Sequence, residues 1–190
     1  MTSDVQLSLG APSILFVTAA SNAIGFGHLS RCISMAVYAR KRGFCTHFLV
    51  FGSMAAEARV IATGFECTLF DESYMYTVEW LHTISLKADA VIVDLLYEGF
   101  LVGDKPPLLF GCLRSLGHLL VAIDVLGEGS IACQLPELNV DIVVSPYVAP
   151  AVNLGKTKWR YLVGAKYALL GPEYFNLPPR QQRIKATVFI

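Results

Sequence analysis

Short apolar runs recur seven times along the chain, and their spacing limits the folds open to it. The runs are rich in β-branched and aromatic side chains, which is typical of strands buried on both faces. Segments with helical or turn signals separate most of them. This alternation predicts an α/β fold, namely a Rossmann-like, doubly wound, mainly parallel sheet of about seven strands. The expected strands span residues 13–18, 46–51, 66–70, 90–94, 119–124, 141–145 and 159–163.

A strong helix pattern follows the first run. From His28 onward apolar residues recur at helical spacing, residues 40–42 make the last turn basic, and Gly43 stands where helices commonly end. Residues 54–63 and 106–116 are also expected to be helical, because a glycine follows each segment. A further helical segment is expected over residues 77–86, with Thr77 as its N-cap.

Composition favours one well-packed domain without a membrane span. The chain has 190 residues, of which 54% are hydrophobic and 16% charged, and its mean hydropathy is +0.53. No apolar stretch reaches the roughly 18 to 20 residues that a transmembrane helix needs. The first residues lack the basic region of a signal peptide, and five scattered cysteines indicate reduced thiols in a cytoplasmic protein. Cysteine and histidine spacing fits no zinc site, so we expect no metal.

Charge is balanced overall but unevenly distributed. Residues 1–50 hold four basic residues and one acid, and residues 151–190 hold seven basic residues and one acid. If these two ends met at one edge of the fold, they would form a positive cleft suited to a diphosphate. Ordinary solvated lysines and arginines explain the same counts equally well. No basic stripe with interleaved aromatic residues is present, so nucleic acid is not an expected partner.

A glycine-containing loop joins the first strand to the first helix. It holds Gly25, Phe26, Gly27 and His28, so the backbone can approach a ligand closely at a helix start, where free N–H groups favour phosphate or sugar hydroxyls. The loop lacks the third glycine of the dinucleotide pattern and the Gly-Lys-Ser/Thr of a P-loop. NAD binding and ATP hydrolysis are therefore not expected.

Other polar groups stand at predicted strand ends. Asp94, together with Tyr97, follows one strand, and Asp124 ends the next. Ligands of such sheets bind beyond the carboxyl ends of the strands, where these groups and His28 could hold a sugar and a water. Each residue taken singly also has a structural explanation, because strand-end carboxylates often cap the next helix or turn and a histidine at a helix start can act as a cap.

The loop and its helix also carry a family resemblance. The stretch IGFGHLSRC at residues 24–32 resembles the first loop and helix of the nucleotide-sugar hydrolases of pseudaminic acid biosynthesis and of the related spore coat polysaccharide biosynthesis proteins. Further matches follow in order at 90–94 with Tyr97, 121–124, 141–144 and 164–175. The last, GAKYALLGPEYF, is the most specific, because it has little generic reason to occur.

The resemblance implies the N-terminal half of a two-domain glycosyltransferase B (GT-B) fold. Residues 1–176 would form its Rossmann-like domain, and residues 177–190 a linker and the first strand of a missing C-terminal nucleotide-binding domain, in the same or another chain. His28 is then the main catalytic candidate, working on a water that displaces UDP from a UDP-amino sugar without a cofactor. The family pattern adds Asp94 and Tyr97 as catalytic residues and Gly25, Phe26, Gly27, Arg31, Asp124 and Tyr167 as substrate contacts.

Two alternatives remain open. In a sugar-transferring GT-B enzyme, His28 or Asp94 would activate a sugar hydroxyl in place of water. In a non-catalytic binding or assembly module, the apolar surface would be covered by a second copy or another partner. The module gains support at residues 94–97, where Asp-Leu-Leu-Tyr stands in place of the family's Asp-His-Tyr. The 190-residue chain alone is expected to be inactive.

Overall fold

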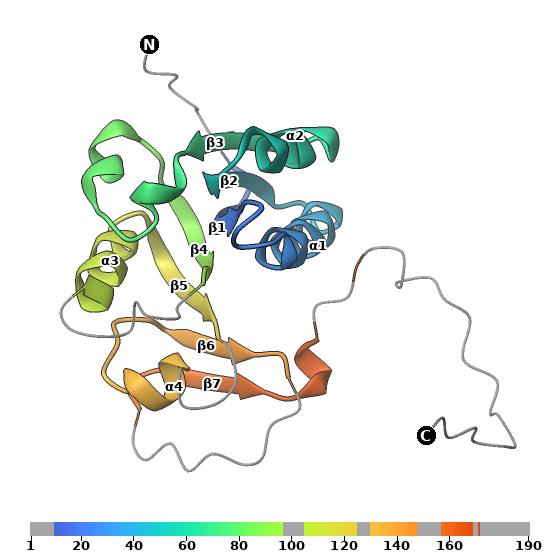
Figure 1. Ribbon diagram of the computed structural model, residues 1–190. Helices are drawn as coiled ribbons and strands as arrows, with labels where there is room; N and C mark the ends of the chain where they lie inside the picture. Colours follow the sequence, from blue (N-terminus) through green and yellow to red (C-terminus); the bar gives the residue numbers. More distant parts are fainter. Residues whose placement is uncertain (1–9, 97–104, 125–129, 148–156, 169–170, 172–190) are drawn as a thin grey trace, which may run out of the picture.

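The computed structural model describes residues 10–96, 105–124, 130–147, 157–168 and 171. Its strands form one seven-stranded sheet in the order β3-β2-β1-β4-β5-β6-β7, in which every neighbouring pair is parallel (Figure 1). The strand bounds are β1 Ser13–Ala20, β2 Cys45–Gly52, β3 Glu66–Phe70, β4 Ala88–Asp94, β5 Gly117–Ile123, β6 Ile142–Ser145 and β7 Arg160–Val163. The predicted Rossmann-like α/β fold and all seven predicted strands are confirmed.

The strand order places a crevice beside β1. From β1, the next two strands in sequence, β2 and β3, are added on one side of the sheet. The chain then returns to the other side of β1, where β4, β5, β6 and β7 are added in turn. Such a reversal leaves the carboxyl ends of the two central strands without a crossover between them, which is where ligands of open α/β sheets bind. The loop after β1 and the last residue of β4 therefore open into the same crevice.

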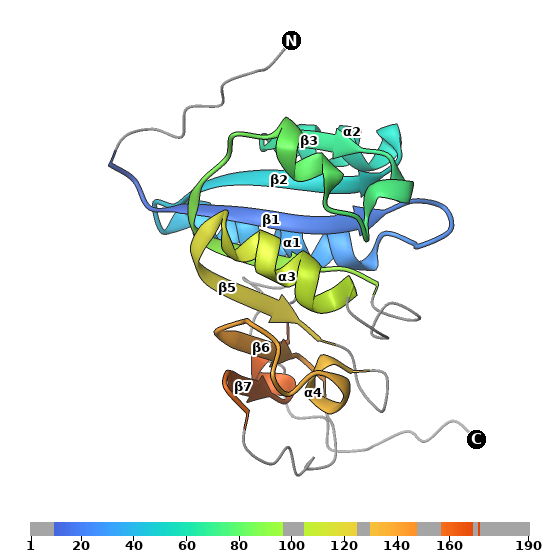
Figure 2. The ribbon, with the colours of Figure 1, turned by 90° about the vertical axis from the view of Figure 1, so that its left-hand side faces the viewer.

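Helices cover the two faces of the sheet. Helices α1 (Gly27–Lys41) and α2 (Met54–Ala62) lie on one face, and α3 (Lys105–Arg114) and α4 (Ile131–Gln134) on the other (Figures 1 and 2). Leu29, Cys32 and Ala36 of α1 pack with Phe16 and Phe48 of the sheet in one buried core. A second core on the other face joins α3, α4 and the buried Trp80 to the sheet and contains Val17, Leu49, Val91 and Leu120.

Most helix predictions agree with the structure. Helix α1 ends as expected, because Gly43 adopts φ +86° and its N–H donates to the Arg40 carbonyl. Helices α2 and α3 match the expected segments 54–63 and 106–116 within a few residues. The four-residue helix α4 was not predicted, since it is too short to show periodicity.

The prediction that Thr77 caps a helix over residues 77–86 is wrong. Two 3₁₀ turns, η1 (Glu72–Tyr74) and η2 (Glu79–Thr83), are found between β3 and β4. The Thr77 hydroxyl donates to the Tyr74 carbonyl, and the buried Trp80 indole N–H donates to the carbonyl of Thr77. Burial of this large ring, rather than helical periodicity, organises the segment.

Two of the sequence predictions concern a membrane-spanning helix and a metal site. None of the helices described combines the length and the apolar character that crossing a bilayer requires. No group of three or more His, Cys, Asp or Glu side chains suited to a metal ion is found in the same part of the chain. The predicted linker and strand over residues 177–190 lie outside the described residues.

Candidate functional site

A tight turn after β1 delivers His28 to the crevice. The Ser21 hydroxyl accepts hydrogen bonds from the N–H groups of Ala23 and Ile24, each at 3.2 Å, and the Gly25 N–H donates to the Ser21 carbonyl at 2.8 Å. Gly25 has φ +83°, a conformation that favours glycine because it has no Cβ. The turn leads directly into α1, so His28 lies in the first helical turn.

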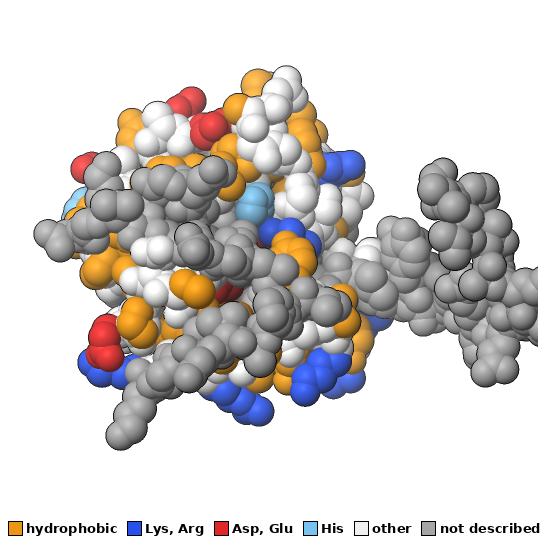
Figure 3. All heavy atoms as spheres, turned by 60° about the horizontal axis from the view of Figure 1, so that its bottom comes forward, with side chains coloured by type: hydrophobic (Ala, Val, Ile, Leu, Met, Phe, Trp, Pro, Cys, Tyr) orange, Lys and Arg blue, Asp and Glu red, His pale blue; other side chains and the backbone are white. Residues whose placement is uncertain are grey.

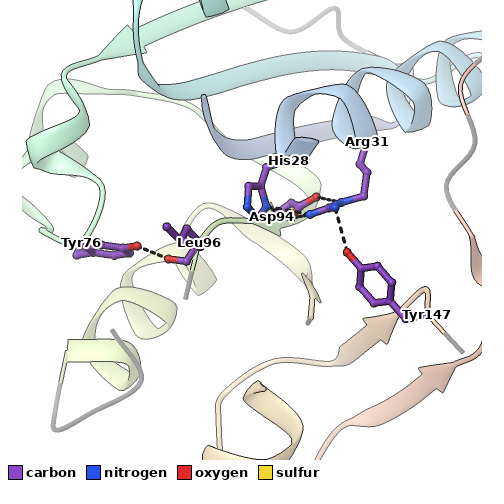
Figure 4. A network of polar contacts seen from close by, with 6 residues as sticks. All are labelled: His28, Arg31, Tyr76, Asp94, Leu96 and Tyr147. Carbon is purple, nitrogen blue, oxygen red and sulfur yellow. Dashed lines mark hydrogen bonds and ion pairs between the residues drawn. The ribbon is translucent and has the colours of Figure 1, made fainter. Parts of the chain in front are cut away.

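Asp94 gathers two of the predicted residues around one carboxylate. It is the last residue of β4 and only 1% exposed. Arg31 donates to it through Nε at 2.8 Å from Oδ2 and through Nη2 at 2.8 Å from Oδ1. The Nδ1 atom of His28 lies 2.7 Å from Oδ1 (Figure 4). Because His28 and Arg31 are three residues apart on α1, they share one helix face and meet Asp94 together.

The ion pair decides which nitrogen of His28 carries the proton. A carboxylate paired with arginine is ionised and can only accept hydrogen bonds. The Nδ1 atom, 2.7 Å from that carboxylate, must therefore be the protonated one, and Nε2 of a neutral ring is left as an acceptor. Arg31 Nη2 lies 2.9 Å from the same Nδ1, but both atoms are then donors, so this approach is not a hydrogen bond.

Arg31 is held charged by its partner. Burial alone lowers the pKa of its guanidinium, but the hydrogen bonds and the negative charge of Asp94 outweigh burial and raise the pKa above its usual value. The cluster therefore combines a negative carboxylate, a positive guanidinium and an imidazole. With a neutral imidazole the three side chains together carry no net charge.

Two tyrosines that the sequence analysis missed lie at this edge. Tyr147, just after β6, accepts a hydrogen bond from Arg31 Nη1 at 3.1 Å. Tyr76 donates to the carbonyl of Leu96, two residues beyond Asp94, and burial, aided by the charge of Glu72, raises its pKa to about 12 (Figure 4). Tyr147 had a usable signal, because it stands two residues after the run predicted over 141–145. Tyr76 had none, because it follows an edge strand at no obvious strand end.

Three predicted substrate contacts have partners within the fold. Both Asp124 oxygens accept N–H groups of α4, from Ile131 at 2.7 Å and Ala132 at 2.9 Å, which is the capping role raised as an alternative from sequence. The Phe26 ring packs against the core beneath α1 and lies 5.1 Å from the Arg59 guanidinium. Tyr167 belongs to a 3₁₀ turn beyond β7, η3 (Ala165–Tyr167), with its ring 5.0 Å from Lys166 Nζ. Tyr97 lies outside the described residues.

The predicted positive cleft between the chain ends depends on residues 151–190, most of which lie outside the described residues and are drawn in grey in Figure 3. Arg40 donates to the carbonyl of Thr63 and lies over the Phe65 ring, 4.3 Å from its centre. Arg42 donates to the Tyr38 hydroxyl. These two arginines thus have local partners within the described residues.

An apolar groove of about 380 Å³ lies elsewhere on the α1 face. Met35 and Tyr38 of α1 line it together with Ile14, Phe16 and Ile92 of the sheet. These α1 residues belong to the C-terminal half of the helix, whereas His28 lies at its start. The groove is lined mainly by apolar side chains and lacks the polar groups of the His28 cluster, so the predicted site residues lie outside it.

Comparison with known proteins adds little beyond this geometry. No protein-family model matches the chain, and no curated protein matches it significantly. Among solved structures, the chain is similar to MurG of Acinetobacter baumannii, with a TM-score of 0.47 and 13% identity over 79% of this chain and 44% of MurG. The chain thus spans less than half the length of MurG. A likeness at this level carries no argument about function, so the Rossmann-like assignment rests on the sheet itself.

Proposed function

We propose that this chain is the N-terminal domain of a UDP-sugar hydrolase with a GT-B fold, acting in bacterial surface polysaccharide or nonulosonic acid synthesis. The observation that carries the proposal is the contact of His28 with buried Asp94 in the crevice between β1 and β4. The resemblance at residues 24–32 and 164–175 supplies the reaction class. The second domain, a homodimer and a cytoplasmic location stay predictions.

The geometry suits His28 to act as a general base. With its proton on Nδ1 and directed at Asp94, the ring keeps a lone pair on Nε2 that can accept a proton from water. The water oxygen would bond to the anomeric carbon while the bond from that carbon to the diphosphate breaks. The electron pair would leave with UDP and the proton would go to Nε2. Asp94 would hold the ring in place and offset the charge of the imidazolium that forms.

The start of α1 is suited to the leaving group. The N–H of Ser30 donates to the Phe26 carbonyl at 2.9 Å, so the N–H groups of residues 27–29 precede the first hydrogen bond of the helix. A helix start carries a partial positive charge that favours phosphate. Gly25 and Gly27 would let a diphosphate approach this backbone. The nucleotide contacts themselves are expected from the second domain.

The decisive experiment measures UDP release from a panel of UDP-amino sugars. It compares this chain, and any longer product of its reading frame, with His28→Ala and with His82→Ala, a matched control at an exposed histidine on η2. We expect His28→Ala to lower release by about 10²- to 10⁴-fold and His82→Ala to leave it unchanged. Failure of every form to release UDP and to bind UDP or the sugars would overturn the proposal.

Product analysis then separates hydrolysis from transfer. A free sugar identifies water as the acceptor, whereas a disaccharide or glycolipid identifies a sugar hydroxyl or a lipid. In both reactions His28 Nε2 takes the proton of the attacking oxygen. If the product is a disaccharide or glycolipid, His28 remains the proposed base, but the enzyme is a transferase and not a hydrolase.

A further inference from the structure

We infer that Tyr147 is a positioning residue for His28, acting through Arg31 and Asp94. Its hydroxyl would set the orientation of the Arg31 guanidinium, and through Asp94 the tautomer of the His28 ring. The inference rests on the proposed function only where it concerns turnover, because the state of the ring can be measured without substrate. No sequence motif assigns a role to Tyr147.

The contacts form one chain across the crevice. Tyr147 comes from the end of β6, two places from β4 in the sheet, and is 116 residues from Arg31 in sequence. Arg31 Nη1 donates to the Tyr147 hydroxyl at 3.1 Å, while its Nε and Nη2 atoms donate to Asp94. Figure 4 shows Arg31 between the two acceptors. The guanidinium is planar and rigid, so an acceptor on one side constrains the plane in which the other two N–H groups point.

Asp94 transmits this constraint to His28. Its Oδ1 atom accepts from both Arg31 Nη2, at 2.8 Å, and His28 Nδ1, at 2.7 Å. The carboxylate is 1% exposed, so water has little access to replace a donor that turns away. A rotated guanidinium would therefore move or unpair Oδ1, and the Nδ1 proton of His28 would lose part of its acceptor.

The Tyr147 hydroxyl is the only part of that side chain that the argument needs. Removing it would leave one Arg31 N–H without its present acceptor, on a side chain that is 22% exposed. Water could reach that N–H but would not hold it in one direction. A tyrosine that merely tied β6 to α1 would affect stability and would leave the His28 tautomer unchanged.

The test is ¹⁵N NMR of the His28 imidazole in the whole chain, compared between wild type and Tyr147→Phe. Tyr38→Phe is the matched control, because it also removes a tyrosine hydroxyl that accepts from an arginine, here Arg42, which directly follows α1 at the opposite end of the helix from His28. In wild type we expect Nδ1 to be protonated and Nε2 to be free. In Tyr147→Phe we expect the tautomer ratio to move toward Nε2–H by roughly twofold to tenfold, the equivalent of one hydrogen bond, and in Tyr38→Phe to stay unchanged.

A lowered melting temperature with an unchanged His28 spectrum in Tyr147→Phe would make Tyr147 a tether and overturn the inference. If Tyr147→Phe does not fold, Arg31→Lys carries the same test, because an ammonium cannot provide the planar fork that joins Asp94 to Tyr147. An unshifted tautomer in Arg31→Lys would likewise overturn it. A shifted tautomer in a chain that neither binds nor cleaves UDP-sugars would uphold the positioning role and reject the proposed function.

Discussion

His28 and Asp94 are 66 residues apart in sequence, yet Nδ1 of one lies 2.7 Å from Oδ1 of the other. The pairing of β1 with β4 explains this contact, because Thr18 and Asp94 are register partners at the carboxyl end of the two strands. The loop that follows β1 then carries α1 and its His28 over the end of β4. The site is therefore a product of strand order as much as of residue type.

Removing the charge of Asp94 should destabilise the fold strongly. In Asp94→Asn the Arg31 guanidinium loses its counterion in a largely buried place, and we expect the free energy of unfolding to fall by about 3 kcal/mol. Urea denaturation measures the change. Glu137→Gln breaks the ion pair of Glu137 with Lys158, in which both side chains are exposed, and should lower the free energy of unfolding by less than about 1 kcal/mol. Equal losses in the two variants would show that the buried pair is solvated like a surface pair.

The close approach of β2 to β1 should make Gly52 irreplaceable. A Cβ at this position would lie 1.9 Å from the carbonyl oxygen of Ala20, and Gly52 has φ +153°. We expect Gly52→Ala to lower the free energy of unfolding by about 3 kcal/mol or more. Gly111→Ala in α3, where a Cβ meets nothing within 4 Å, should raise it by about 0.5–1 kcal/mol. Thermal denaturation of the two variants measures these changes. If Gly52→Ala is as stable as wild type, the close approach of Gly52 to the Ala20 carbonyl is wrong.

Acid should destabilise the chain partly through His47. Burial lowers the pKa of this histidine below 6.5, and the opposing contact with Glu66 does not restore it. The unfolded chain therefore binds a proton first, so stability is present above about pH 6.5 and declines as the pH falls below it. We expect His47→Gln to flatten this decline in denaturation curves between pH 7 and 5. His82→Gln, at an exposed histidine, should show the same decline in stability as wild type. Identical slopes in wild type and His47→Gln would contradict the assignment.

Alkali should act through Tyr76. Burial, with a contribution from the charge of Glu72, raises the pKa of its phenol to about 12, above the ordinary value of 10.0. The unfolded chain loses this proton first, so the stability is complete below pH 10 and declines as the pH rises toward 12. We expect Tyr76→Phe to show a smaller drop in melting temperature from pH 9 to 11 than wild type. Tyr74→Phe, at an exposed tyrosine on η1, should behave like wild type. If the melting temperature of Tyr76→Phe fell as much as that of wild type from pH 9 to 11, Tyr76 would not be the cause of the alkaline loss of stability.

Much of the architecture could be read from local patterns. The central strands β1 and β2 are apolar runs buried largely on both faces, so their hydrophobicity marks them, whereas the edge strands β3 and β7 are only partly buried. The end of α1 was marked by its basic last turn and Gly43, and the structure has both. The segment between β3 and β4 escaped prediction, because its turns are organised by the burial of Trp80 against Phe51 and Phe70 rather than by a repeating pattern.

The sequence by itself determined that strands and helices alternate and that polar residues stand at strand ends, because both depend on side chains close together in the chain. Only the tertiary structure decided which of those polar residues meet. His28, Arg31, Asp94 and Tyr147 converge because β4 and β6 follow β1 on the same side of the sheet, with their carboxyl ends at one edge. Asp124 ends a neighbouring strand, yet its oxygens are bound by α4. Strand order and the competition for buried hydrogen-bond donors are long-range properties, so no local pattern could predict them.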